Sequence, residues 1–205
     1  MLRAFSLFGR STFVAAAAPM LRQLQGSSLY KEVLGPRWSG LPATVRRLHE
    51  PGCARGPFTI RRGAGVMSAV LGWLCRFPVA GEQVPTRLVV QQDGALQRWE
   101  RSFGGHVLTT VQRAREGGLI GEQLGPVECV FQVRPVEGGI AYEQVGAWLC
   151  LGPLRLPLPR VLAPRIEATA LGVPEGMQVR VTVGSSMAGW LLTYEGLVRP
   201  EEEAP

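Results

Sequence analysis

With 205 residues, 46% of them hydrophobic and 19% charged, the chain is long enough to bury the core of one globular domain. Its net charge of +6 comes from 22 basic residues, of which Lys31 is the only lysine, and the arginines are scattered through apolar segments, which argues against a nucleic-acid-binding protein. Asp93 is the sole aspartate, and His49 and His106 are the sole histidines, which argues against a Ser-His-Asp catalytic triad.

Residues 1–27 contain Arg3, Arg10 and Arg22 but no acidic residue. We expect them to form an N-terminal extension, either a helix or a targeting segment. The expected location is the cytoplasm, with export or organelle targeting as the alternative if the extension is a targeting segment. No uncharged apolar run reaches the roughly 18 residues that a spanning helix needs, so the chain is predicted not to span a membrane.

Two short helices are predicted next. Residues 29–34 form the first, which a Gly-Pro pair ends. In the second, Leu41, Val45 and Leu48 repeat at helical spacing and form one apolar stripe. His49 adjoins this stripe, and we interpret it as a helix-end histidine that meets backbone carbonyls, with a catalytic base as the alternative.

An apolar helix is predicted over residues 66–75, after a strand over residues 58–62. Because its apolar side chains nearly align, we expect a sheet to cover them. These side chains are Val66, Val70, Trp73 and Leu74.

From Pro85 onward apolar and polar residues alternate with period two, as in half-buried strands. The turn signals between them leave no room for parallel crossovers, which predicts an antiparallel meander. The fold class is therefore α+β and mainly β: a curved sheet of about eight to ten strands, partly closed into a barrel, with short N-terminal helices and the apolar helix packed on it. This single domain covers residues 28–199, and residues 200–205 form an acidic tail that we expect to be disordered. The turn signals are Asp93-Gly94, Gly104-Gly105, Gly117-Gly118, Gly125-Pro126 and Gly138-Gly139.

Three strands have the clearest faces. Their apolar sides contain Leu88 and Val90, then Val127, Cys129, Phe131 and Val133, then Val179, Val181 and Val183. The side chains expected to point outward are Glu128, Gln132, Arg180 and Thr182.

Residues 97–106, QRWERSFGGH, place Trp99, Arg101 and Phe103 on one face of a strand. The Arg101 side chain either covers the rings and pairs with a buried glutamate, or binds the polar end of a ligand between them. The first reading is favoured, because a Gly-Gly turn ends the strand and only glutamates are available as partners.

Glutamates in apolar strands are the better catalytic candidates, because burial raises the pKa of a carboxyl group toward the range useful for acid or base catalysis. Glu143, Glu167 and Glu195 fit this description. Each is alternatively a counter-ion for Arg101 or Arg165, which we favour because a buried charge needs a partner.

Residues 146–158 are apolar on both faces, which predicts a strand covered on both sides or a surface for a partner or lipid. Arg155, Arg160 and Arg165 then recur every five residues and are expected to gather on one edge. A solvated edge is the favoured reading, and contact with phosphates or an acidic partner is the alternative.

The four cysteines, Cys53, Cys75, Cys129 and Cys150, lie far apart without a zinc-binding pattern. We expect reduced and largely buried thiols, no metal site and no bound cofactor.

Six short motifs follow one another along the chain. They are Leu29-Tyr30 to Gly35, Leu41 to His49, Trp99-x-Arg101-x-Phe103-Gly104-Gly105, Gly125-Pro126, Leu156 to Glu167, and Tyr194-x-Gly196. In this order and spacing, residues 29–197 resemble the bacterial domain-of-unknown-function family 4166. Members occur alone or behind a saccharopine-dehydrogenase-like NAD(P)-binding domain. The resemblance therefore implies an accessory module, whose NAD(P)-dependent dehydrogenase partner would be a separate polypeptide, and it carries no assigned reaction.

Three functional hypotheses follow. The first is an auxiliary domain, not an enzyme, that binds a small apolar or amphipathic ligand through Trp99, Arg101, Phe103 and Arg165. The second is a cofactor-free isomerase or lyase that uses His49 or a buried glutamate such as Glu167 or Glu195 as base, with Arg101 stabilising an oxyanion. The third is a module that docks a partner through residues 148–158.

Overall fold

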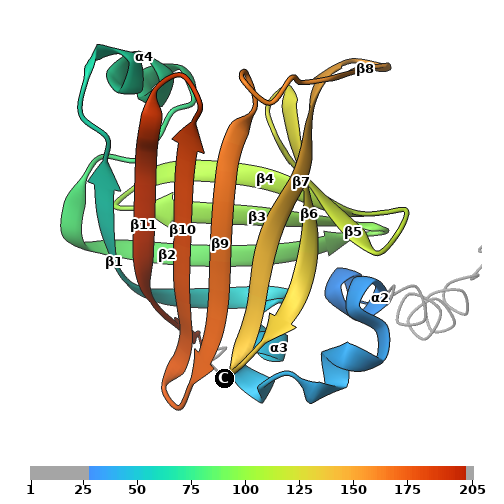
Figure 1. Cartoon of the computed structure of the whole chain (residues 1–205). Coiled ribbons are helices and arrows are strands. Elements are labelled where there is room, and N and C mark those ends of the chain that lie inside the picture. Colours follow the sequence, from blue (N-terminus) through green and yellow to red (C-terminus); the bar gives the residue numbers. More distant parts are fainter. Residues whose placement is uncertain (1–27, 202–205) are drawn as a thin grey trace, which may run out of the picture.

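Ten antiparallel strands close into a barrel in the computed structural model, which describes residues 28–201 (Figure 1). Around the barrel the order is β6-β5-β4-β3-β2-β1-β11-β10-β9-β7, and β6 pairs with β7 to close it. The predicted mainly β fold is confirmed, and the closure is complete rather than partial. The barrel strands are β1 (Gly52–Arg62), β2 (Gly81–Asp93), β3 (Leu96–Phe103), β4 (His106–Arg115), β5 (Leu119–Leu124), β6 (Val127–Val136), β7 (Gly139–Leu151), β9 (Pro164–Val173), β10 (Gly176–Ser185) and β11 (Gly189–Pro200).

Strands β2 to β7 follow one another as hairpins, as the turn signals predict. Glycine is needed at these turns because the chain enters the left-handed region there, with φ of 57° at Gly94 and 55° at Gly104. The antiparallel meander is therefore confirmed from Gly81 to Leu151.

One strand lies outside the barrel. β8 (Leu154–Pro157) pairs only with the end of β7, so residues 146–158 form a projecting hairpin instead of one covered strand. Leu151, Leu154 and Leu156 on this hairpin are exposed, which excludes the reading of a strand covered on both sides.

Three short N-terminal helices cover one end of the barrel, at the bottom of Figure 1. They are α2 (Leu29–Leu34), the 3-10 helix η1 (Gly35–Gly40) and α3 (Ala43–Leu48). The predicted stripe of α3 is confirmed, since Leu41, Val45 and Leu48 are all buried in the core. None of the helices in residues 28–201 is long and apolar enough to cross a membrane.

The main core lies inside the barrel and joins the N-terminal helices to the inward faces of the strands. The predicted inward residues are confirmed, with Leu88, Val90 and Val133 buried and Val179, Val181 and Val183 partly buried against the core. A second cluster lies beside it and contains Cys129, Phe131, Ala147 and Ala163.

Helix α4 (Val66–Leu74) lies at the opposite end of the barrel, near the β10–β11 turn (Figure 1). The predicted helix exists, but the expectation that the sheet covers its apolar face is wrong, because Val66 and Trp73 are 82% and 80% exposed. Its small residues face the barrel instead. Ser68 and Gly72 are buried, and the Arg62 guanidinium lies against Gly72, so that a side chain at this position would have to displace it.

The first two residues of the predicted tail, Pro200 and Glu201, have a defined structure. Pro200 ends β11, and the Glu201 carboxylate binds Arg87 at 3.0 Å. The predicted N-terminal extension, residues 1–27, and residues 202–205 lie outside the described part of the chain.

Candidate functional site

Strand β3 points Trp99, Arg101 and Phe103 into the barrel, as the alternation predicts. Trp99 and Phe103 are 5% and 4% exposed and belong to the main core. The Arg101 side chain, between them on the same face, keeps 15% exposure.

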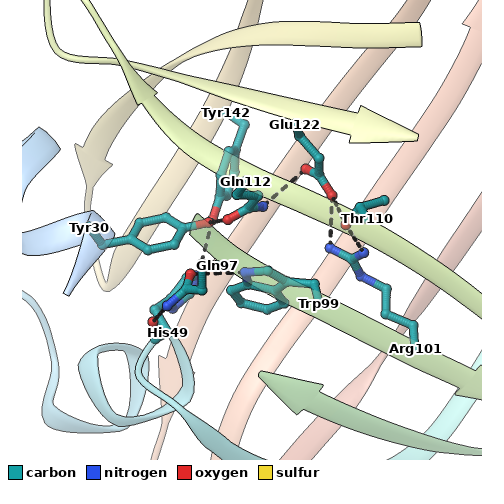
Figure 2. Close-up of polar contacts among 9 residues, drawn as sticks. All are labelled: Tyr30, His49, Gln97, Trp99, Arg101, Thr110, Gln112, Glu122 and Tyr142. Carbon is teal, nitrogen blue, oxygen red and sulfur yellow. Dashed lines mark hydrogen bonds and ion pairs between the residues drawn. The ribbon is translucent and has the colours of Figure 1, made fainter. Parts of the chain in front are cut away.

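Arg101 has the structural partners that the first reading requires (Figure 2). Its guanidinium lies 5.3 Å from the Trp99 ring centre and donates to Glu122 at 3.1 Å and to the Thr110 hydroxyl at 2.8 Å. Burial disfavours the charged form, yet the Glu122 carboxylate outweighs this and the pKa of Arg101 is raised. The counter-ion of Arg101 is therefore Glu122 on β5, which lies one strand beyond β4, and not one of the three predicted glutamates, which lie on β7, β9 and β11.

A row of hydrogen bonds connects this ion pair to His49 (Figure 2). The Gln112 amide donates to Glu122 at 3.1 Å, and the Tyr30 hydroxyl donates to the Gln112 carbonyl oxygen at 2.8 Å. The Tyr142 hydroxyl lies 2.8 Å from that of Tyr30 and 3.0 Å from His49 Nε2. Side chains from α2, from the end of α3 (His49 directly follows the helix) and from the barrel wall thus form one continuous polar cluster.

With a neutral His49 ring, this row of hydrogen bonds has one hydrogen too few for its contacts. The ring Nδ1 donates to the Val45 carbonyl at 2.7 Å, so in a neutral ring Nε2 carries no hydrogen and can only accept one. The Tyr142 hydroxyl donates its hydrogen to Tyr30, which leaves none for the contact between Tyr142 and His49 Nε2. Protonation of His49 would supply the missing hydrogen, but burial lowers the pKa of His49 to about 4.

The tyrosines around this cluster remain protonated, because burial raises the pKa of Tyr30, Tyr142 and Tyr194. Tyr194 lies opposite Val181 on the inward face of β11, and the Arg101 charge opposes the rise in its pKa. Unlike Tyr30, its hydroxyl has no hydrogen-bond partner among residues 28–201.

The remaining predicted site residues do not join Arg101. Glu143 binds Arg134 at 2.9 Å on the surface, and Glu195 lies 3.7 Å from Arg180 and 3.9 Å from Arg61. Glu167 and Arg165 are exposed near the start of β9. His49 joins the cluster but is 2% exposed, so it confirms the helix-end interpretation: it follows α3 and meets the Val45 carbonyl.

Two depressions, of about 470 and 630 Å³, lie near the N-terminal helices. The first borders Leu41, Pro42 and Val136, and the second borders Leu48, Arg87 and Glu201. Neither is bordered by Trp99, Arg101 or Phe103.

A buried carboxylate outside the barrel was missed by the strand pattern. Glu128 points outward as predicted, but it is fully buried because the β7–β8 hairpin lies on this face and Gly121 leaves space for its carboxylate. Arg155 binds it at 2.6 Å and Arg113 lies 3.4 Å away. Burial would raise the pKa of Glu128, but its arginine partners, with Arg115 the strongest, outweigh this effect and lower it.

The four cysteines are free thiols, but only Cys129 is buried and Cys75 is exposed, so the expectation of largely buried thiols holds for one of them. Within residues 28–201, no three histidine, cysteine, aspartate or glutamate side chains gather in a way that could hold a metal ion.

The closed barrel, plugged at one end and holding a polar cluster inside, defines a mainly β single-domain protein. Residues 41–198, more than half of the chain, match the family described as "Domain of unknown function (DUF4166)", and the chain belongs to that family. No curated protein matches the chain at a significant level.

Proposed function

We propose that the barrel interior binds a small amphipathic molecule, with Arg101 holding its polar end. The observation that carries this proposal is the partial exposure of inward-facing groups. The side chains of Arg101 and Glu122 keep 15% and 20% exposure, although both point into a closed barrel. The N-terminal helices cover one end of this barrel (Figure 1). Because both side chains point inward, a ligand that contacted their exposed atoms would lie inside the barrel.

The wall around Arg101 has the character that an amphipathic ligand requires. Leu108, directly opposite Arg101 on β4, and Val179, Val181 and Val183 on β10 are apolar, inward-facing and only partly buried. An apolar wall with a few convergent polar groups is the usual composition of a small-molecule site. The Arg101 guanidinium and the unpartnered Tyr194 hydroxyl are the donors available to an anionic or carbonyl-bearing head group.

Binding of cis-parinaric acid, a fluorescent fatty acid, tests this proposal. We expect Arg101→Gln to weaken binding at least tenfold, whereas Arg98→Gln, on the outward face of the same strand, leaves it unchanged. Val181→Trp should abolish binding by filling the interior, and Thr182→Trp, one residue away on the outward face, should not. Equal binding by the Val181→Trp protein, shown to be folded by circular dichroism, would refute the proposal.

A second candidate function is that of a cofactor-free isomerase or lyase. The observation that favours it is the row of hydrogen bonds that links buried His49 to the more exposed Glu122. In this scheme Glu122 removes a proton from the substrate and Arg101 stabilises the oxyanion. The test is incubation with 2-decanone in D2O, followed by mass spectrometry. Faster deuterium uptake with wild-type protein than without protein would support this function if the Glu122→Gln variant loses the difference. Uptake at the protein-free rate would exclude the function for this ketone.

The resemblance to a family that accompanies NAD(P)-binding domains is the support for a separate NAD(P)-dependent oxidoreductase as partner. In this arrangement the barrel would hold the apolar substrate of that enzyme. Stimulation of such an enzyme by wild-type protein, but not by Val181→Trp, is the expected result.

A further inference from the structure

We propose that the α4 end of the barrel docks onto an anionic lipid bilayer. The surface consists of residues 62–81, 151–166 and 184–192, which we call the apolar rim. The inference goes beyond ligand binding inside the barrel and does not depend on it.

Helix α4 presents its apolar face to solvent. Val66, Val70 and Trp73 follow one another at helical spacing and are 82%, 51% and 80% exposed. The opposite face, with Ser68 and Gly72, packs against the barrel end. A stripe that would normally be buried is therefore left without a partner in residues 28–201.

The other two rim segments meet α4 at the same end of the barrel (Figure 1). The Gly63 amide donates to the Leu191 carbonyl at 2.8 Å, and the Ser186 hydroxyl donates to the Arg160 carbonyl at 3.4 Å. Twelve of the sixteen large hydrophobic side chains that are exposed in residues 28–201 belong to the rim, so their exposure is concentrated at one end. They are Val66, Met67, Val70, Trp73, Val79, Leu151, Leu154, Leu156, Val161, Leu162, Met187 and Trp190.

The positive charge of the apolar rim indicates an anionic partner. The three rim segments contain five arginines and no acidic residue, and the exposed Glu82 and Glu167 directly follow two of them. Arg155 binds the buried Glu128 and the Arg62 guanidinium lies against Gly72 of α4, whereas Arg76, Arg160 and Arg165 are exposed and form no ion pair with any residue in 28–201. The rim is therefore apolar and positively charged at once.

An anionic bilayer satisfies both properties. Exposed tryptophan, methionine and valine side chains insert at the boundary between head groups and acyl chains, where tryptophan is enriched. Arginines around them keep their guanidinium groups at the level of lipid phosphates. The nine residues of α4 are too few to cross the hydrocarbon core, so the helix would lie in the interface.

Cosedimentation of the full chain with vesicles tests the proposal. Vesicles of phosphatidylcholine with about 30% phosphatidylglycerol should bind the protein at least tenfold more strongly than phosphatidylcholine alone, and added salt should weaken binding because it screens the arginines. Val66→Glu/Trp73→Glu should reduce binding at least tenfold. The matched control Leu96→Glu/Val136→Glu adds the same charge at exposed apolar positions outside the rim and should bind like wild type.

Three outcomes would overturn the proposal. Equal vesicle binding by the Val66→Glu/Trp73→Glu variant would show that α4 is not the contact. Absence of binding to anionic vesicles would exclude the bilayer as the partner. Concentration-dependent dimerisation of the wild type, lost in the Val66→Glu/Trp73→Glu variant, would instead show that the rim binds a second copy of the chain. The variant should still bind cis-parinaric acid without vesicles, so failure of bilayer docking is separated from failure of the proposed ligand site.

Discussion

The Arg101 guanidinium and the Glu122 carboxylate bind each other inside the barrel, 3.1 Å apart, although their strands, β3 and β5, are separated by β4. The two side chains meet over Thr110, whose hydroxyl donates to Glu122 at 2.6 Å and accepts from Arg101. Each charge therefore has a charged and a neutral partner, as an ion pair largely removed from water requires.

Glu122→Gln should destabilise the protein by about 2–4 kcal/mol, because it leaves the Arg101 charge without a counter-ion inside the barrel. The value lies toward the lower part of the range for buried pairs because solvent still reaches both groups. Chemical denaturation of both proteins measures the difference. Glu143→Gln, which breaks the exposed pair with Arg134, should cost less than about 1 kcal/mol. Equal losses in the two variants would contradict the placement of Arg101 inside the barrel.

The local parts of the fold were predictable because they depend on neighbours in sequence. The glycine turns limit the chain to hairpins, and the spacing of Leu41, Val45 and Leu48 defines the buried side of α3. Barrel closure was only partly predictable, because the pairing of β1 with β11 joins strands far apart in sequence. The orientation of α4 was not predictable from its helical pattern, because its small residues Ser68 and Gly72 face the barrel and its apolar stripe faces solvent.

The candidate site was predictable only as far as Arg101 and its two aromatic neighbours. Alternation in β3 indicates that Arg101 points inward and needs an acidic partner, but the choice of Glu122 depends on the register of β4 with β5, which places Gln112 opposite Glu122. Tyr30 is a similar case. Its sequence context shows an apolar helix position, and only the tertiary fold brings its hydroxyl to Gln112.

Glu128→Gln should cost about 3 kcal/mol and loosen the β7–β8 hairpin, because the buried carboxylate holds Arg155 at 2.6 Å and compensates Arg113 and Arg115 as well. Denaturation gives the stability loss, and limited trypsin digestion reports access to the Arg155 peptide bond. Faster cleavage there is expected. Glu201→Gln, which breaks a surface pair with Arg87, is the control and should leave the cleavage rate unchanged.

Acidification should destabilise the fold through His49. Burial, opposed by the Val45 carbonyl and aided by the Arg101 charge, lowers its pKa from the ordinary 6.5 to about 4, so between these values the unfolded chain binds a proton that the folded chain does not. The contribution of neutral His49 is complete above pH 6.5 and is lost as the pH falls to 4. Wild type should therefore lose about 3 kcal/mol more than His49→Gln between pH 7 and pH 4. Identical pH profiles would show that His49 is not buried in its neutral form.

Tyr30→Phe should cost about 1–2 kcal/mol, because the Tyr30 hydroxyl donates to Gln112 and lies 2.8 Å from the Tyr142 hydroxyl, so its removal leaves a buried amide oxygen without a donor. Tyr194→Phe provides a matched control from the same core, since the Tyr194 hydroxyl has no hydrogen-bond partner in residues 28–201 and its loss should change stability by less than about 0.5 kcal/mol.

The two variants also separate stability from binding. If the Tyr194 hydroxyl meets the head group of a bound fatty acid, Tyr194→Phe should weaken binding of cis-parinaric acid several-fold while Tyr30→Phe does not. The reverse pattern would place the head group at the plugged end of the barrel, away from Arg101.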